Sequence, residues 1–153
     1  MTRTGLILLA VLGSGGLLGG AFLFQFLGYP PCAMCLWQRW PHAAAIVIGI
    51  VALAVQGRLL PVLGALAALS TAGIGFFHTG VERDWWEGPA SCTGTGLGGL
   101  DASDLLSTAG DRLVMCDKVS WELFTISMPS WNAIFSLILV AIWVRAVLVS
   151  GRA

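Results

Sequence analysis

Cys32 and Cys35 are separated by two residues and directly follow Pro31. Two cysteines at this spacing can close a small disulfide or bind a soft metal ion. Pro31 suits the first turn of a helix, where its missing N–H would have no partner anyway. Both sulfurs would then lie near a helix N-terminus, whose dipole favours the thiolate over the thiol. The spacing therefore predicts a thiol–disulfide centre at the beginning of a helix.

A permanent positive charge, Arg39, follows one helical turn after the second cysteine. Steps of three and four residues stay on one face of a helix, so Cys32, Cys35, Arg39 and His42 form one stripe. A guanidinium on that stripe favours a thiolate at Cys35. Without the cysteines beside it, Arg39 would be interpreted as an ordinary anchor at a membrane surface.

Two further cysteines, Cys92 and Cys116, bring the total to four. An even number in a small protein with an acidic external loop is typical of an oxidising compartment. Two alternatives stay open on these residues. Either all four thiolates bind zinc or an iron–sulfur cluster, or Cys92 and Cys116 form a purely structural disulfide. Haem attachment is excluded because Leu36, and not a histidine, follows Cys35.

The composition indicates how these residues are positioned. The 153 residues are 57% hydrophobic and 10% charged, whereas soluble domains carry about 25% charge. Four apolar stretches each approach the roughly 20 residues that span a bilayer. We therefore predict an all-α membrane protein, a four-transmembrane-helix bundle in a single domain, residues 1–153. The helices are expected at about 5–27, 33–55, 59–78 and 129–149, with loops on the cysteine side at about 28–32 and 79–128.

The first apolar stretch is longer than the apolar core of a signal peptide. It continues past the only small-residue cleavage site, through Phe22 and Phe24. We therefore expect an uncleaved transmembrane helix.

The charged residues segregate along the chain. All eight acidic residues lie between Glu82 and Glu122, within the longer loop, together with three of the eight basic residues. Arg3, Arg58 and Arg145 fall on the opposite side of a four-helix bundle, with no acidic residue near them. The positive-inside rule makes that side cytoplasmic and places all four cysteines outside, where disulfides persist.

The longer loop begins after His78, which we expect to end the third helix as a cap or interface residue. Gly94–Gly99 predicts a flexible arm that leaves Cys92 accessible. Its G-x-G-x-x-G pattern does not indicate a nucleotide site, because no predicted strand precedes it. Asp101–Met115 predicts a short amphipathic helix.

Together, these residues resemble the DsbB family of bacterial inner-membrane, quinone-dependent disulfide oxidases. The likeness covers the whole chain: four helices, a Pro-Cys-x-x-Cys motif opening the second, and Arg39 four residues after that motif. The cysteine pair of the long loop also matches, as does Trp121, five residues after Cys116. So does the sequence Met-Pro-Ser-Trp at 128–131, which leads into the last helix.

The resemblance implies a relay through two redox disulfides, Cys32–Cys35 and Cys92–Cys116. A reduced DsbA-like periplasmic protein of the thioredoxin fold would attack the loop disulfide and form a mixed disulfide with Cys92. Cys116 would then attack Cys32, which transfers the electrons to the pair at the membrane.

The resemblance also implies a quinone, ubiquinone or menaquinone, as the electron acceptor. Cys35 would face the quinone as a thiolate, and Arg39 would hold the quinone and support the charge. His78 stands where the family also has a histidine, and the resemblance implies a place in the quinone pocket as the alternative to a capping or interface role.

The implied function is that of a quinone-dependent thiol–disulfide oxidoreductase of the bacterial inner membrane, with no bound metal and no nucleic-acid partner. The alternative is a non-enzymatic membrane protein whose four cysteines bind metal or staple the loops. An enzyme similar to vitamin K epoxide reductase is a rival within the first class. Its cysteine pair usually comes late in the chain, whereas here Cys32 and Cys35 open the second helix.

Overall fold

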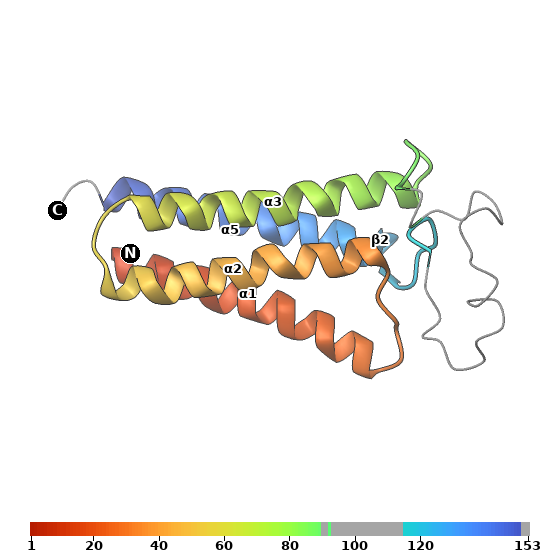
Figure 1. The fold of residues 1–153 in the computed structure, drawn as a ribbon, viewed down its shortest axis with the longest axis horizontal. Coiled ribbons are helices and arrows are strands. Elements are labelled where there is room, and N and C mark those ends of the chain that lie inside the picture. The colour runs from red at the N-terminus through yellow and green to blue at the C-terminus, as the bar shows by residue number, and fades with distance from the viewer. Residues whose placement is uncertain (90–91, 93–114, 151–153) are drawn as a thin grey trace.

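Four long helices and one short hairpin make up the described part of the chain, residues 1–89, 92 and 115–150 of the computed structural model. The helices are α1 (Arg3–Phe26), α2 (Ala33–Ala54), α3 (Leu59–Glu82) and α5 (Met128–Val149). The strands are β1 (Glu122–Leu123) and β2 (Ile126–Ser127), which pair antiparallel. The helices form an elongated bundle in which α1 packs on α2 and α5, and α3 packs on α2 and α5 (Figure 1).

Each of these four helices is long and apolar enough to cross a membrane. The predicted all-α bundle of four transmembrane helices is therefore confirmed for the residues that the structure describes. The observed bounds of α1, α2 and α5 lie within two residues of the predicted ones. Long apolar stretches can satisfy their backbone polar groups in lipid only as helices, which explains the agreement.

The third helix is longer than predicted, because α3 continues through His78 to Glu82. The expectation that His78 ends this helix is wrong by one turn. Two contacts support the extra turn. The Thr79 hydroxyl donates to the Gly75 carbonyl at 2.9 Å, and the Trp86 ring folds back over the place where Gly80 has no side chain. Trp86 Nε1 also donates to the Phe77 carbonyl at 2.8 Å.

Small residues let the helices approach closely in the half of the bundle away from the cysteines. Trp143 of α5 is fully buried there, and a Cβ at Gly64 of α3 would lie only 2.6 Å from its ring. Ile7 of α1 and Ala68 of α3 belong to the same buried cluster. Close packing of small residues is the usual basis of helix association in a membrane.

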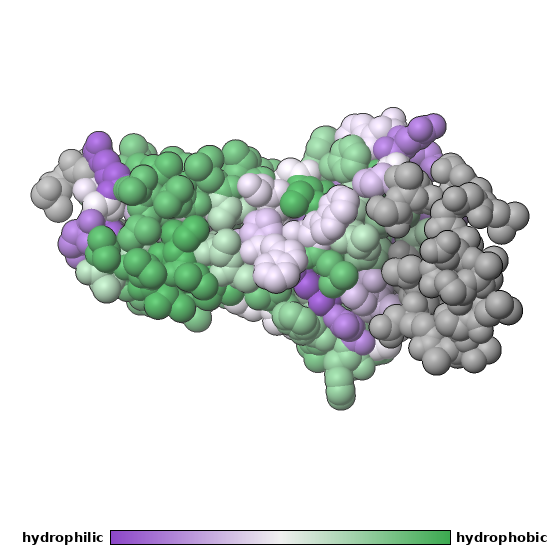
Figure 2. Space-filling model, viewed as in Figure 1, coloured by the Kyte–Doolittle hydropathy of each residue, from purple (hydrophilic) through white to green (hydrophobic). Residues whose placement is uncertain are grey.

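The outer face of the bundle is apolar. Large side chains such as Leu12, Leu59 and Leu66 are exposed on the helices. In Figure 2, hydrophobic residues cover much of the visible helical surface, and strongly hydrophilic residues gather toward its two ends. This is the surface expected of a protein whose solvent is lipid.

The two ends of the bundle differ in what they carry. The N-terminus, the α2–α3 turn and the end of α5 lie together at one end, and the segments with the cysteines lie at the other (Figure 1). At the first end, Arg3 donates to the Val55 carbonyl at 2.9 Å and to Ser150 Oγ at 3.0 Å. The predicted flexible arm at Gly94–Gly99 lies outside the described residues, as does nearly all of the predicted helix at Asp101–Met115.

Candidate redox site at one end of the bundle

The Cys32–Cys35 pair opens α2, but not as the sequence indicated. The helix begins at Ala33, and Cys32 is its N-cap, with an extended backbone and a sulfur that accepts the Cys35 N–H at 3.2 Å. Pro31 therefore precedes the first helical turn instead of lying in it. The sulfurs of Cys32 and Cys35 are 2.9 Å apart, and both are free thiols. Cys32 is buried and Cys35 is half-buried.

The loop cysteines form a disulfide, Cys92–Cys116, which packs against this pair. Cys92 is only 2% exposed, and both residues pack against Cys32, Met34 and Val81. The Cys116 N–H donates to the Cys92 carbonyl at 2.6 Å, so a backbone hydrogen bond accompanies the disulfide. The expectation of an accessible Cys92 is therefore wrong for this arrangement, because an apolar cluster at the helix ends covers its sulfur.

The sulfurs of the other three cysteines all lie close to that of Cys32. The sulfur atoms of Cys32, Cys92 and Cys116 lie within 4.8 Å of one another, and Cys35 Sγ is 2.9 Å from Cys32 Sγ. Residues that are 60 or more apart in sequence are thus brought within reach of thiol–disulfide exchange. Two groups of residues, Cys32 with Cys35 and His78, and Cys32 with Cys92 and Cys116, are also close enough together to hold a metal ion, so the metal alternative stays a prediction to be tested.

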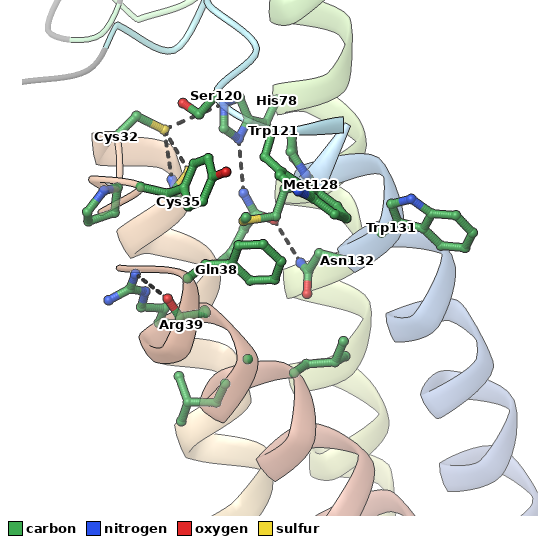
Figure 3. Close-up of a pocket in the computed structure, with 18 of the residues that line it drawn as sticks. Cys32, Cys35, Gln38, Arg39, His78, Ser120, Trp121, Met128, Trp131 and Asn132 are labelled. Carbon is green, nitrogen blue, oxygen red and sulfur yellow. Dashed lines mark hydrogen bonds between the residues drawn. The ribbon is translucent and has the colours of Figure 1, made fainter. Parts of the chain in front are cut away.

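His78 contacts the same sulfur from α3. Its Nε2 lies 3.5 Å from Cys32 Sγ, and its Nδ1 lies 3.1 Å from Gln38 Nε2 (Figure 3). The side chain is 2% exposed and also interacts with the backbone of Cys116. His78 therefore lies between the two cysteine pairs, inside the helix and not at its end.

Arg39 lies one turn deeper along α2 and interacts with α1. It donates to Gln25 Oε1 at 2.7 Å and to the Ala21 carbonyl at 3.3 Å. Its guanidinium also lies over the Phe22 ring, 4.7 Å from the centroid. These contacts hold the charge at the wall of the cavity described next.

A cavity of about 390 Å³ opens beside the cysteine pair. Cys32, Cys35, Arg39 and His78 all line it, so the structure brings these predicted residues around one space. Most of the remaining lining is apolar and comes from α1, α5 and the segment after Cys116, including Leu17, Phe24, Trp121, Met128, Trp131 and Phe135. Its volume is within the range of small-molecule sites, about 300–1,000 Å³.

Comparison with known proteins adds an independent observation. The family model described as disulfide bond formation protein DsbB matches residues 3–146. The chain belongs to the DsbB family. It is 30% identical to disulfide bond formation protein B of Xanthomonas oryzae pv. oryzae (strain MAFF 311018) over 151 residues, 89% of this chain and 84% of the relative. It is 33% identical to the protein of that name from Verminephrobacter eiseniae over 141 residues, 84% of this chain and 78% of the relative. No solved structure gives a significant match.

Membership of the DsbB family confirms the resemblance inferred from the residues and makes the chain a disulfide bond formation protein, an oxidoreductase class.

The charge distribution at its cysteines is less simple than the helix dipole alone predicts. The hydrogen bond from Cys32 to Cys35, with burial, raises the pKa of the Cys32 thiol far above its ordinary value. This direction differs from the expectation that both thiols are acidified, because Cys32 donates its hydrogen bond to the Cys35 sulfur.

Sequence reasoning missed three polar residues of this DsbB-family site. Asn132 of α5 donates to Gln38 Oε1 at 2.7 Å and to Thr71 Oγ1 at 3.1 Å. The available signal was the presence of a polar side chain in the apolar stretch of each of these helices, since such residues are rare in membrane spans and usually face the bundle interior.

Proposed function

We propose that this chain is a protein-disulfide oxidase that reoxidises a DsbA-like thioredoxin-fold protein and passes the electrons to a membrane quinone. The observation that carries the proposal is the convergence of four sulfurs on Cys32 at the wall of an apolar cavity. One side of this cluster is the loop disulfide, and the other side is the cavity that Cys35 and Arg39 also line.

The first half of the reaction moves electrons from the partner to the membrane pair. A thiolate of the reduced partner attacks Cys92 and releases Cys116, and Cys116 then attacks Cys32 of an oxidised Cys32–Cys35 pair, releasing Cys35 as a thiolate. The second attack needs little movement, because the three sulfurs of Cys32, Cys92 and Cys116 lie within 4.8 Å. The first needs Cys92 to become accessible to the partner, because Cys92 is 2% exposed.

The second half restores both disulfides. The second thiol of the partner attacks its own mixed disulfide and leaves oxidised, which frees Cys92 as a thiolate. Cys92 attacks Cys116, the loop disulfide forms again, and Cys32 leaves as a thiolate. Cys32 and Cys35 then give two electrons and, with solvent, two protons to the quinone as they join. The net change is one dithiol oxidised and one quinol formed.

The cavity residues fit a quinone. Its lining is mostly apolar, as a quinone ring and its isoprenoid tail require, and the tail can lie along the exposed glycine-rich face of α1 at Gly16 and Gly20. Arg39 offers guanidinium donors to an oxygen that gains negative charge on reduction. When bound, the quinone supplies a two-electron acceptor beside Cys35.

The orientation follows from charge. Arg3 and Arg58 lie at the end of the bundle away from the cysteines (Figure 1). By the positive-inside rule that end is cytoplasmic, and the cysteine end faces the periplasm of a bacterial inner membrane. A DsbA-like partner is itself periplasmic, so it meets the relay on the correct side.

The experiment is to mix purified protein, a reduced thioredoxin-fold partner and either ubiquinone or menaquinone, and to follow quinone absorbance. Wild-type protein is expected to reduce quinone catalytically, and Cys35→Ser is expected to abolish this. Absence of quinone reduction with both quinones overturns the proposal. Metal analysis of the same sample tests the alternative of a non-enzymatic four-cysteine metal site, for which a stoichiometric metal ion is required.

A further inference from the structure

A chain of polar side chains links three helices beneath the cysteines. It runs from His78 of α3 through Gln38 of α2 to Asn132 of α5 (Figure 3). His78 and Gln38 are 2% and 6% exposed. Buried polar groups in an apolar region must be paired, so the direction of each hydrogen bond here is under strong constraint.

A backbone carbonyl fixes the orientation of the Gln38 amide. Gln38 Nε2 lies 3.2 Å from the Met34 carbonyl, which can only accept a hydrogen bond. This end of the amide is therefore the NH2 group, and the same nitrogen lies 3.1 Å from His78 Nδ1. Since an amide NH2 cannot accept, His78 Nδ1 accepts and carries no proton.

A second backbone carbonyl fixes the other half of the chain. The Thr71 hydroxyl donates to the backbone carbonyl of Gln38 at 3.2 Å. Thr71 Oγ1 is therefore left to accept from Asn132 Nδ2 at 3.1 Å. Asn132 Nδ2 also donates to Gln38 Oε1 at 2.7 Å. Asn132 Oδ1 then accepts from His42 Nε2 at 2.9 Å. The side-chain amides of Gln38 and Asn132 therefore each use both N–H groups. Exchanging the oxygen and nitrogen of either amide would place two acceptors, or two donors, against each other.

These constraints meet at the sulfur. A neutral imidazole whose Nδ1 accepts has its proton on Nε2, and His78 Nε2 lies 3.5 Å from Cys32 Sγ. We propose that Gln38, held by Asn132, is a positioning residue that fixes His78 in the Nε2–H form, so that His78 donates to the Cys32 sulfur. His78 is then a fixed donor to Cys32 and not the base that removes its proton.

The role of this donor rests on the proposed function. When Cys92 attacks Cys116 and the Cys32–Cys116 bond breaks, Cys32 leaves as a thiolate. The Nε2–H of His78 points at the sulfur that takes the charge, and His78 also interacts with the backbone of Cys116. A charge-assisted hydrogen bond of this kind lowers the free energy of the thiolate and of the step that forms it.

The direct test is nitrogen NMR of the full-length protein with isotope-labelled histidine in nanodiscs, above the ordinary pKa of the ring. The chain has two histidines, and a His42→Gln variant assigns their signals. We expect a proton on Nε2 of His78 and none on Nδ1. A proton on Nδ1 in the wild-type protein overturns the proposal without any further variant.

Gln38→Glu supplies the decisive variant. Above the pKa of the introduced carboxyl, which burial raises, the carboxylate can only accept, so the His78 proton is expected to move to Nδ1 and the donor to Cys32 is lost. Gln56→Glu, the same change at an exposed residue in the α2–α3 turn, leaves the ring unchanged. An unchanged His78 tautomer in folded Gln38→Glu protein also contradicts the proposal.

A kinetic readout connects the tautomer to the relay. Quinone reduction is expected to slow about tenfold in Gln38→Glu, from the loss of one hydrogen bond to a charged sulfur, and to be unchanged in Gln56→Glu. A shifted His78 tautomer with an unchanged rate of quinone reduction overturns the role of His78 in the relay. The proposed tautomer and the proposed oxidase function can fail separately, since the tautomer is measured without quinone or partner.

Discussion

Arg39 donates a 2.7 Å hydrogen bond to Gln25 and thereby joins the cysteine helix to α1. Arg39 Nη2 also reaches the Ala21 carbonyl, and Phe22 lies against the guanidinium face. α1 therefore holds the guanidinium that α2 contributes to the cavity wall.

Arg39→Ala is expected to lower quinone reduction by roughly ten- to a hundredfold, because a hydrogen bond to a charged group contributes about 1.5–3 kcal/mol. Arg39→Lys is expected to recover part of the loss, since it keeps the charge without the planar fork. Steady-state rates over a range of quinone concentrations provide the measurement. If Arg39→Ala kept wild-type kinetics, Arg39 would be only an anchor to α1.

Cys116→Ser leaves Cys92 as a free thiol, which is expected to trap a single-cysteine partner whose thiol is activated as a mixed disulfide with a small aromatic thiol. The Cys92 thiolate attacks the partner sulfur, the small thiol leaves, and no Cys116 remains to release the partner. Non-reducing gel electrophoresis after mixing with the activated partner detects the adduct. Cys92→Ser is the matched control and is expected to form none. An adduct that forms in Cys92→Ser and not in Cys116→Ser would reverse the proposed order of transfer.

The raised pKa of the Cys32 thiol predicts how its reactivity depends on pH. Because the largest cause is the hydrogen bond to Cys35, Cys32 of the reduced protein is expected to stay protonated, and slow to alkylate, beyond the ordinary thiol pKa. The hydrogen bond that protonated Cys32 donates to Cys35 stabilises the fold at low pH, and this contribution is lost as pH rises through the raised pKa of Cys32. Cys35→Ala removes the partner, so the pH at which Cys32 alkylates is expected to fall. A midpoint that stays put or rises in Cys35→Ala would contradict this assignment.

Reporter cysteines test the orientation in a background with all four native cysteines replaced by serine. Glu87→Cys lies at the cysteine end of the bundle and Gln56→Cys at the opposite end, and both residues are exposed. A membrane-impermeant maleimide is expected to label Glu87→Cys in intact cells with a permeable outer membrane, and Gln56→Cys only after lysis. The reverse pattern would place the relay in the cytoplasm.

Packing around Trp143 gives a prediction for stability. Gly64→Ala would place a methyl group 2.6 Å from the Trp143 ring, so it is expected to destabilise the bundle by about 1–3 kcal/mol through overpacking. Gly73→Ala, on the same helix but with open space around it, is the control and is expected to be neutral or slightly stabilising. Thermal unfolding in detergent distinguishes the two, and equal midpoints would contradict the close approach of α3 and α5.

The helices were predictable because hydropathy alone decides which segments can cross a bilayer. The end of α3 could not be predicted in this way, because Thr79 and Gly80 are residues typical of a helix end. Their contacts with Gly75 and Trp86 are seen only in the folded structure. Such contacts depend on the folded loop.

Within the site, the relative position of Cys32, Cys35 and Arg39 could be predicted, because it follows from their spacing along one helix. The pairing of Gln38 with Asn132 joins residues 94 positions apart. It depends on how α2 and α5 rotate toward each other, which no local pattern encodes. The burial of Cys92 depends in the same way on the packing of its loop against Val81 and Met34.

The buried position of Cys92 has a consequence for which reductants the relay accepts. Exchange requires a thiolate to approach the attacked sulfur, and a sulfur that is 2% exposed offers little approach to small thiols that diffuse freely. A protein that docks at this end of the bundle and exposes Cys92 can supply the energy for that exposure from its own interface. The burial of Cys92 therefore acts as kinetic insulation: free low-molecular-weight thiols are expected to reach the disulfide slowly, and a docked protein faster.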